Sequence, residues 1–339
     1  MNKIKISLDA MGGDHAPEIV VEGAAEAKVR YPDIEFIFFG NKKILNPLIE
    51  RKHNLSESEI VHTMEFIKPN DKPSNVIRRG ANTSMALAIK SVKNQSSAMV
   101  SAGNTGALMA FSKLFLKTIS GINRPAIAAC FPTKRGEVCM LDLGANIECD
   151  KNNLIQFALM GQAFAKIVIG IKNPKVSLLN IGEEEIKGLS YIQEASEILK
   201  NLSKIINYCG YVEGDRITDG LVDVIVTDGF TGNIALKTAE GTAKMIQSNL
   251  KNAFNSSISS KLGYIMSSQA LRSMSEKLDP RVHNCGILMG LNSLVVKCHG
   301  ESEFKGVSYA ADIIHSLISN NVNDKIEEYL RKMKDNPDN

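Results

Sequence analysis

The stretch Ala98-Met-Val-Ser-Ala-Gly-Asn-Thr-Gly-Ala-Leu-Met-Ala110 passes from a strand pattern to a helix pattern through a short polar loop. The apolar residues Ala98–Val100 predict a buried strand, and the polar, glycine-bearing turn Ser101–Gly106 follows it. From Ala107 to Leu116, apolar residues recur at the three-to-four spacing of an amphipathic helix. A strand that leads through such a loop into a helix is the building unit of α/β proteins.

The same unit recurs along much of the chain. The predicted strands are Ile4–Leu8, Ile34–Phe39, Ala98–Val100, Ala126–Ala129, Val138–Leu141, Val176–Ile181 and Val222–Thr227. The predicted helices between them are Glu18–Arg30, Ser84–Lys93, Thr105–Leu116, Leu154–Ile167 and Ile192–Leu202. This alternation predicts a Rossmann-like α/β fold, with three layers around a mainly parallel sheet. Since no internal repeat or low-complexity linker interrupts the pattern, we expect a single domain over residues 1–339.

A second pattern occupies residues 234–280. Apolar residues at helical spacing run from Ile234 to Leu278, and the Ser- and Asn-rich stretch Asn255–Ser260 interrupts them. We expect two long helices that form a hairpin protruding from the α/β body, with Leu262–Met266 near its tip. The charged stretch Asp324–Asn339 predicts a fraying helix after the body.

The composition excludes several classes of protein. Of the 339 residues, 44% are hydrophobic and 23% are charged, which is typical of an ordinary globular protein. Lys and Arg number 40 and Asp and Glu number 37, so the formal charge is only +3. A protein whose whole surface binds nucleic acid carries a larger positive charge, so we expect no nucleic-acid partner.

Cysteine spacing and the N-terminal pattern indicate the cellular setting. The six cysteines contain no C-x-x-C pair and no neighbouring cluster at metal-ligand spacing, so we expect reduced, mostly buried thiols and no bound metal. Residues 1–9 alternate polar and apolar side chains, which predicts a first strand and not a signal peptide. No window reaches the roughly 18 apolar residues of a membrane span. We expect a cytoplasmic protein whose membrane contact, if any, is peripheral.

The glycine positions exclude the commonest α/β chemistries. No two of the 25 glycines are separated by a single residue, so the G-x-G-x-x-G dinucleotide fingerprint is absent. The spacing of a Walker A loop is absent as well, and no serine lies at the centre of a G-x-S-x-G elbow. An α/β protein without these motifs uses its sheet in another way.

Polar, glycine-bearing loops follow the predicted strands. They are Asp9–Pro17, Ser101–Gly106, Asp142–Asn146, Gly182–Gly188 and Asp228–Asn233. In a parallel sheet, all of these loops emerge at one carboxyl edge, where open α/β folds bind ligands. We therefore expect them to converge on one crevice.

Ser101–Gly106 has the features of a phosphate-binding loop. Its glycines allow close approach of the backbone to a ligand, and the following helix offers free N–H groups and a positive dipole end. The alternative is that Asn104 or Thr105 is only the N-cap of that helix. Gly229–Asn233 repeats the design and leaves the same alternative, a tight turn and cap before a long helix.

Charged side chains in these loops admit more than one role. Lys187 is either a solvated residue paired with Glu183 or Glu184, or a cation that reaches into the crevice to hold an anion. His15 is either a base or orienting donor, or part of a turn. The aspartates after the strands have the chemistry to bind Mg²⁺, but we interpret them as acceptors for backbone N–H groups. They are Asp9, Asp14, Asp142 and Asp228.

Together, these segments resemble the phosphate acyltransferase family of bacterial phospholipid synthesis. The matching segments are Leu8–Pro17, Val100–Ala110, Arg124–Ala126, Pro132–Lys134, Leu141–Asn146, Asn180–Glu184 with Lys187-Gly188, and Thr227–Lys237. They occur in order over nearly the whole chain. One segment departs from the family pattern: His283-Asn-Cys-Gly-Ile-Leu-Met-Gly290 stands where the family reads Tyr-Gly-Gly-Ala-Pro-Leu-Leu-Gly. The resemblance therefore fixes neither the backbone path there nor the preference for acyl chain or carrier.

The resemblance implies the reversible transfer of a fatty acyl group from acyl carrier protein to inorganic phosphate, which gives acyl phosphate for phospholipid synthesis. It implies a fold similar to phosphate acetyltransferases and isopropylmalate dehydrogenases, a homodimer, no cofactor, and hand-off of product to a membrane glycerol-3-phosphate acyltransferase. Phosphate is already a nucleophile and a thiolate leaves readily, so positioning and oxyanion stabilisation suffice without a covalent enzyme intermediate.

The resemblance also implies roles for residues. Lys187 and Asn233 match family positions that orient phosphate and donate to the oxyanion, and His15 is a further catalytic candidate. The expected phosphate- and substrate-binding residues are Asp9, Gly12, Gly13, Ser101, Gly103, Asn104, Thr105, Gly106, Asn146, Asp228 and Gly229. Two alternatives come next: a phosphotransacetylase that uses CoA thioesters, and a non-catalytic regulator that binds a phospho-ligand. A metal-dependent 2-hydroxyacid dehydrogenase of similar fold ranks lower, because its characteristic motifs are not seen.

The predicted hairpin carries more positive charge than the whole chain. Between Lys237 and Arg281 there are seven basic and three acidic residues, a net charge of +4, so the rest of the chain sums to −1. This charge suits an acidic carrier protein or an anionic lipid surface. Expected contact residues are Lys261, Leu262, Ile265 and Arg272. The alternative is that the apolar tip packs on a second subunit.

Overall fold

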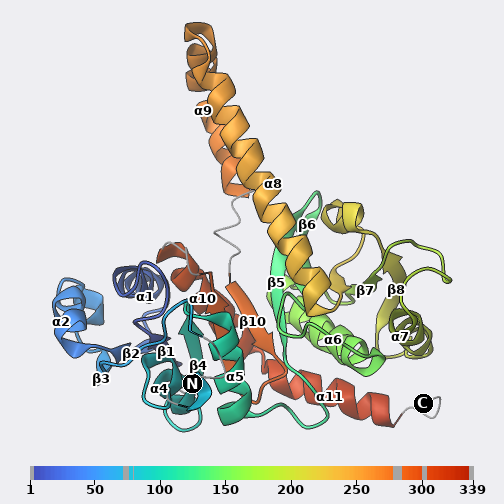
Figure 1. Cartoon of the computed structure of the whole chain (residues 1–339), viewed down its shortest axis with the longest axis horizontal. Coiled ribbons are helices and arrows are strands. Elements are labelled where there is room, and N and C mark those ends of the chain that lie inside the picture. Colours follow the sequence, from blue (N-terminus) through green and yellow to red (C-terminus); the bar gives the residue numbers. More distant parts are fainter. Residues whose placement is uncertain (1–3, 72–75, 79, 278–284, 300–303, 336–339) are drawn as a thin grey trace.

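A central mixed sheet organises the computed structural model, which describes residues 4–71, 76–78, 80–277, 285–299 and 304–335 (Figure 1). The sheet has 11 strands in the order β3-β2-β1-β4-β11-β10-β5-β6-β9-β7-β8. The strands are β1 (Lys5–Asp9), β2 (Glu35–Gly40), β3 (Glu59–His62), β4 (Ala98–Ser101), β5 (Ala126–Thr133), β6 (Gly136–Leu141), β7 (Lys175–Leu179), β8 (Asn207–Val212), β9 (Val224–Val226), β10 (Cys285–Met289) and β11 (Leu294–Cys298).

Helices cover both faces of this sheet. They are α1 (Glu18–Arg30), α2 (Lys42–Glu50), α4 (Ser84–Ser91), α5 (Thr105–Leu116), α6 (Lys151–Phe164), α7 (Ser190–Asn201), α8 (Gly229–Asn255), α9 (Ile258–Lys277), α10 (Phe304–Ser319) and α11 (Val322–Lys334). A π-helical turn, Ala165–Ile169, extends α6, and 3-10 turns lie at His53–Leu55 and Gly214–Asp219. The predicted strands and helices are therefore confirmed, and β3, β8, β10, β11, α2 and α10 add to them.

Successive side chains of the strands point to opposite faces of the sheet, and each face carries its own hydrophobic core. In β2, Phe36 and Phe38 belong to the core that packs under α1, α6, α10 and α11, whereas Ile37 and Phe39 belong to the core under α4 and α5. In β6, Leu141 faces the first core and Met140 the second. Strands buried on both faces explain why these segments read as short, continuous apolar runs.

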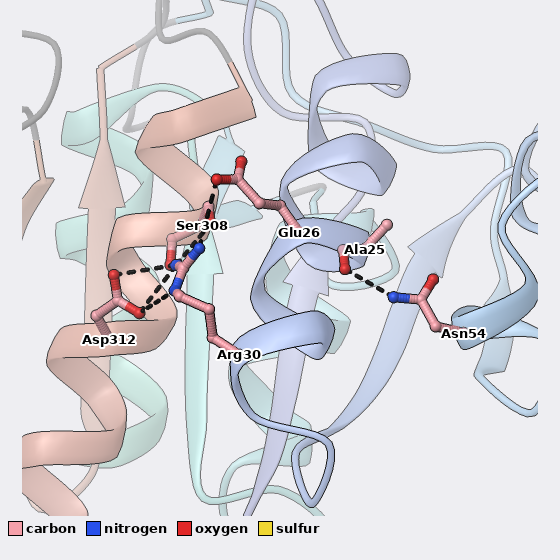
Figure 2. Close-up of polar contacts among 6 residues, drawn as sticks. All are labelled: Ala25, Glu26, Arg30, Asn54, Ser308 and Asp312. Atoms are coloured by element: carbon pink, nitrogen blue, oxygen red, sulfur yellow. Dashed lines mark hydrogen bonds and ion pairs between the residues drawn. The ribbon is translucent and has the colours of Figure 1, made fainter.

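Polar contacts hold α1 against its neighbours on the face of the sheet that α1 and α10 cover (Figure 2). The Arg30 guanidinium donates to the Asp312 carboxylate of α10 at 2.9 Å and to the Ser308 hydroxyl at 2.8 Å. On the other side of α1, the Asn54 amide donates to the Ala25 carbonyl oxygen at 2.7 Å. These contacts hold the helix that follows the β1 loop in place against the layer formed by α10.

The two parts of the sheet run in opposite directions. β1 is parallel to β2 and β4, and β4 is parallel to β11. β10 is antiparallel to both β11 and β5, and β5 is antiparallel to β6. β6, β9, β7 and β8 are parallel to one another. The carboxyl ends of β6, β7 and β9 therefore point away from those of β1 and β4.

This arrangement corrects the expectation that all the strand-end loops share one carboxyl edge. β5 and β6 pair from Thr133 with Gly136 onward, so only Lys134 and Arg135 lie between the paired positions. So tight a connection reverses the chain, because a parallel crossover needs a dozen or more residues. The short spacing between the predicted strands Ala126–Ala129 and Val138–Leu141 already contained this signal.

The helices α8 and α9 form the expected hairpin, which projects from the body in Figure 1. Near its turn, the rings of Phe254 and Tyr264 meet edge to face with centroids 5.4 Å apart. No helix in the described part of the chain is both long enough and apolar enough to cross a membrane.

Candidate active site

The loops after β1 and β4 are joined by the buried carboxylate of Asp9. The Ser84 hydroxyl donates to Asp9 Oδ1 at 2.6 Å, and the Ser101 hydroxyl donates to Asp9 Oδ2 at 2.7 Å. The Ser101 oxygen in turn accepts a hydrogen bond from the Gly103 N–H at 3.0 Å. Burial raises the pKa of Asp9, and the serine hydrogen bonds act in the opposite direction. Asp9 therefore organises the loops, as expected. Its hydrogen-bond donors include two side-chain hydroxyl groups and not only the expected backbone N–H groups.

Close approach of these loops requires glycine at position 12. A Cβ at Gly12 would lie 2.4 Å from Asp9 Oδ2 and 3.0 Å from the Gly103 nitrogen, so no side chain fits there. The next residue, Gly13, has a φ of +110°, a conformation that side chains disfavour. Both glycines shape the loop, and Gly13 also lines a cavity.

Asn104 caps helix α5 at the rim of this cavity. Its side-chain oxygen accepts from the Ala107 N–H at 2.9 Å, and its amide group donates to the Pro69 carbonyl oxygen at 2.7 Å. The N-cap interpretation is therefore confirmed for Asn104. Thr105 and Gly106, in the first turn of α5, line the cavity beside it. Capping and ligand binding are compatible, because the cap leaves other first-turn N–H groups outside the helical pattern.

The cavity has a volume of about 1420 Å³ and lies between the two parts of the sheet. Its polar lining includes Gly103, Asn104, Thr105, Gly106 and Asn233 from the predicted site, together with Lys237, Lys297 and His299. Its apolar lining includes Phe66, Ile67, Phe131, Leu143 and Leu236. The loop after β6 and the first turns of α8 reach this cavity even though their strands point the other way.

A second buried carboxylate, Asp142, organises the loop after β6. Its Oδ1 accepts from the N–H groups of Ile127 and Ala145, each at 3.0 Å. Its Oδ2 accepts from the Asn146 N–H at 2.7 Å and from the Asn146 side-chain amide at 2.8 Å. Burial raises the pKa of Asp142, opposed by these hydrogen bonds. Asn146, predicted to bind substrate, is buried in this loop and also donates to the Pro125 carbonyl oxygen.

Asp228 and Gly229 position the start of α8. Asp228 is the N-cap and accepts from the Thr231 N–H at 2.9 Å and from the Thr231 hydroxyl at 2.8 Å. The Gly229 N–H donates to the Asn146 carbonyl oxygen at 2.7 Å. Neither Asp228 nor Gly229 lines the cavity, and both hold the turn that presents Asn233 to it.

Lys187 and His15 lie outside the cavity lining. Both side chains are exposed. The Lys187 backbone is fixed, since its N–H donates to the Glu184 carbonyl oxygen at 3.0 Å and its carbonyl oxygen accepts from Asn180 at 3.1 Å. Glu183, one of the partners suggested for Lys187, instead pairs with Arg216. Of these three catalytic candidates, Asn233 is the one that lines the cavity.

Sequence reasoning missed the cations of the cavity. Lys297 lies in β11, His299 follows this strand, and Lys237 lies in α8. The run Leu294-Val-Val-Lys-Cys298 had the β-branched character of the other strands, and a basic residue near its end was the available signal. Lys237 Nζ contacts Glu240 Oε2 at 2.7 Å and His299 Nε2 at 3.1 Å.

The hairpin tip is exposed in this chain. Leu262, Ile265 and Met266 are 58%, 66% and 88% exposed, so they do not belong to either core. Lys261 is exposed beside them. Arg272 lies in α9, but its side chain is outside the described part. In the departing segment, Cys285–Met289 form β10, whereas His283 and Asn284 lie outside the described residues.

The cysteines are mostly buried, as expected. Cys130, Cys139, Cys285 and Cys298 are buried, Cys149 is half-buried and Cys209 is exposed. Burial raises the pKa of the Cys149 thiol to about 12, so it is protonated at neutral pH.

Comparison with known proteins gives a family and a fold. Residues 4–325 match the model of a family described as fatty acid synthesis protein. A phosphate acyltransferase from Parvibaculum lavamentivorans is 48% identical over 333 residues, covering 97% of this chain and 92% of the relative. A phosphate acyltransferase from Rhodospirillum centenum is 47% identical over 331 residues, covering 97% and 93%.

Solved structures show the same fold at low sequence identity. A phosphotransacetylase from Streptococcus pyogenes superposes with a TM-score of 0.63 at 19% identity, covering 96% of this chain and 94% of the other. A phosphotransacetylase from Staphylococcus aureus gives a TM-score of 0.58 at 17% identity, covering 93% and 94%. The expected similarity to phosphate acetyltransferases is therefore confirmed for the architecture.

Proposed function

The chain belongs to the fatty acid synthesis protein family and is a phosphate acyltransferase, and from this premise we propose that it transfers a fatty acyl group from acyl carrier protein to inorganic phosphate. The observation that carries the proposal is the cavity, which is lined both by the polar start of α5 and by apolar side chains that include Phe131, Leu143 and Leu236. Its volume of about 1420 Å³ suits a long acyl chain together with a small anion. Typical small-molecule sites have volumes of roughly 300–1,000 Å³.

The proposed reaction is a direct displacement. A phosphate oxygen attacks the thioester carbonyl carbon, a C–O bond forms and the C–S bond breaks. The electron pair of the C–S bond leaves with the sulfur, which takes up a proton to give the free thiol of the carrier. The products are acyl phosphate and thiol, and the same steps in reverse regenerate the thioester.

Within this reaction, the cavity positions the reactants and stabilises charge. We assign phosphate binding to the Gly103–Gly106 turn and the first turn of α5, where backbone N–H groups and the helix dipole favour an anion. Asn233 lines the same cavity, and we assign to its amide the hydrogen bond to the carbonyl oxygen as negative charge develops. The roles proposed for Lys187 and His15 rest on the family resemblance alone.

Acyl carrier protein is the proposed donor because of the charge on the hairpin. The segment from Lys237 to Arg281 has a net charge of +4, and an acidic carrier is attracted to such a surface. α8 runs from Asn233 at the cavity into this hairpin, so a docked carrier has a direct route to deliver its thioester.

The exposed apolar tip suggests further partners. We propose a homodimer, peripheral association with membranes, and hand-off of acyl phosphate to a membrane glycerol-3-phosphate acyltransferase. Leu262 and Ile265 present apolar surface beside Lys261, a combination that suits an anionic lipid interface. Polar substitutions at Leu262 and Ile265 should reduce binding to anionic liposomes, and unchanged binding argues that the tip contacts another protein surface.

One assay tests the acyl transfer. The protein is supplied with phosphate and a fatty acyl thioester of either acyl carrier protein or CoA, and acyl phosphate is trapped with hydroxylamine. We expect hydroxamate from the carrier thioester and much less from the CoA thioester. The reverse preference supports a CoA-dependent phosphotransacetylase. Phosphate binding without product from either donor supports a phospho-ligand-binding regulator and contradicts the proposed reaction.

A further inference from the structure

Lys297 brings a positive charge to the cavity beside the Ser101–Gly106 loop. It lies in β11, where its register partner in β4 is Ser101, the residue that begins the Ser101–Gly106 loop. Its side chain is half-buried and lines the cavity. The Nζ donates to the Ala102 carbonyl oxygen at 3.4 Å and to the Cys298 carbonyl oxygen. The ammonium group therefore lies directly against the loop that the sequence marked for phosphate.

Among the described residues, the hydrogen-bond acceptors of this ammonium group are neutral carbonyl oxygens. No carboxylate in the described part of the chain forms an ion pair with Lys297. Asp9 acts on it electrostatically, but each carboxylate oxygen of Asp9 is already hydrogen-bonded to Ser84 or Ser101. Burial lowers the pKa of Lys297, which means that its charged form is poorly solvated. An anion in the cavity would compensate that loss of solvation.

Lys237 differs from Lys297 in that a carboxylate pairs with its charge. Lys237 lines the same cavity from α8, but Glu240 Oε2 lies 2.7 Å from its Nζ and His299 Nε2 lies 3.1 Å away. The charge of Lys237 is therefore balanced within the protein, whereas the contacts of Lys297 leave its charge available to a ligand.

The start of α5 adds positive potential at the same place. Asn104 caps the Ala107 N–H, and the helix begins at Thr105, which lines the cavity with Gly106. The first turn of a helix carries unpaired N–H groups and the positive end of the dipole. Two independent features, a lysine from β11 that contacts the β4 loop and the helix that this loop leads into, thus line the same cavity.

We propose that Lys297 binds the phosphate acceptor directly and holds it between its ammonium group and the first turn of α5. The inference rests on the proposed acyl transfer to phosphate and names the cation that positions the acceptor within the cavity. Leu143 and Leu236 line the same cavity and offer apolar surface for the acyl chain.

The test measures binding of inorganic phosphate to the full chain without any acyl donor, by titration calorimetry. Lys297→Met removes the charge but keeps much of the stem, and we expect its phosphate dissociation constant to rise at least about tenfold. Lys297→Arg keeps the charge and should bind more tightly than Lys297→Met. Lys166→Met is the matched control, because Lys166 is also half-buried but contacts the Tyr329 hydroxyl away from the cavity. It should bind phosphate as the wild type does.

The outcomes separate this inference from the proposed function. A folded Lys297→Met protein with wild-type phosphate affinity overturns the role of Lys297 and shows that the lysine only holds the Ala102 and Cys298 carbonyls. If that variant does not fold, Lys297→Gln makes the same comparison, and unchanged affinity again overturns the role. A wild-type protein that binds phosphate through Lys297 but forms no acyl phosphate contradicts the acyl transfer alone. A wild-type protein that binds no phosphate contradicts both.

Discussion

Asp9 and Asp142 occupy corresponding places in the two oppositely directed parts of the sheet, yet they hold their loops by different means. Asp9 ends β1 and binds the hydroxyl groups of Ser84 and Ser101. Asp142 follows β6 and gathers backbone N–H groups of Ile127, Ala145 and Asn146. The hydroxyl partners of Asp9 belong to two separate segments. Asp142 instead binds backbone N–H groups, two from its own loop and one, that of Ile127, from the neighbouring strand β5.

The backbone arrangement around Asp142 leaves little room for change. A Cβ at Gly232 would lie 1.9 Å from the Asp142 carbonyl oxygen, and a Cβ at Gly229 would lie 2.6 Å from the Asn146 carbonyl oxygen. The first turn of α8 therefore packs against this loop in direct backbone contact. Since that turn presents Asn233 to the cavity, the Asp142 loop sets the position of a proposed oxyanion donor.

The largest effect should follow from Asp142→Ala. The substitution leaves several buried N–H groups without an acceptor, and each such group costs about 1–3 kcal/mol. We expect the free energy of unfolding to fall by about 3–5 kcal/mol, measured by urea denaturation. Asp142→Asn keeps one acceptor oxygen and should lose less. Equal stability of Asp142→Ala and the wild type would show that the loop does not depend on this carboxylate.

Asn233→Ala should affect turnover and spare the fold. Loss of one oxyanion donor costs about 10²–10³ in kcat, and Asn233 lies at the cavity without a place in either core. The family resemblance predicts a comparable loss for Lys187→Ala. Steady-state kinetics with carrier thioester and phosphate, combined with circular dichroism, measure both. Wild-type turnover of a folded Lys187→Ala variant would show that Lys187 takes no part in catalysis. The residues that line the cavity would then remain as the catalytic candidates.

The sequence predicted this site unevenly, for physical reasons. The loops after β1, β4 and β6 were identified because aspartate, glycine and asparagine after an apolar run have strong local preferences. The direction of β6 was missed because the strand and helix pattern was interpreted as mainly parallel, although the short spacing between Ala126–Ala129 and Val138–Leu141 leaves no room for a parallel crossover. Lys297 was missed because β11 was not recognised as a strand, and its place beside Ser101 depends on pairing over a long sequence separation.

Ser101→Ala and Ser84→Ala test how Asp9 links its segments. Both serines donate to the buried carboxylate, so each alanine variant should lower the free energy of unfolding by about 2 kcal/mol. Only Ser101 also accepts from the Gly103 N–H, so only its loss should loosen the Gly103–Gly106 turn. We expect the KM for phosphate to rise by about tenfold in Ser101→Ala and clearly less in Ser84→Ala. Equal KM values would show that Asp9 stabilises the fold without shaping the anion site.

The smallest effect should come from the hairpin turn, which lies at the far end of α8 from the cavity. Lys261 is exposed near the hairpin turn, so its interaction with an acidic carrier is long-range and screened by salt. Lys261→Glu should raise the KM for carrier thioester about three- to tenfold at low salt, and the difference should shrink toward 1 M salt, where the Debye length is about 3 Å. The KM for phosphate should not change, because the cavity lies at the other end of the helix.

Lys43→Glu is the control for this comparison, since Lys43 is an exposed lysine on α2 and lies outside the hairpin. It changes the net charge of the chain by the same amount as Lys261→Glu. If both variants raise the KM for carrier thioester equally, the carrier responds to total charge and the hairpin has no special role. If only Lys261→Glu does so, α8 joins two sites of different physical character: a cavity where single hydrogen bonds govern the rate, and an exposed tip where distributed charge governs encounter with the carrier.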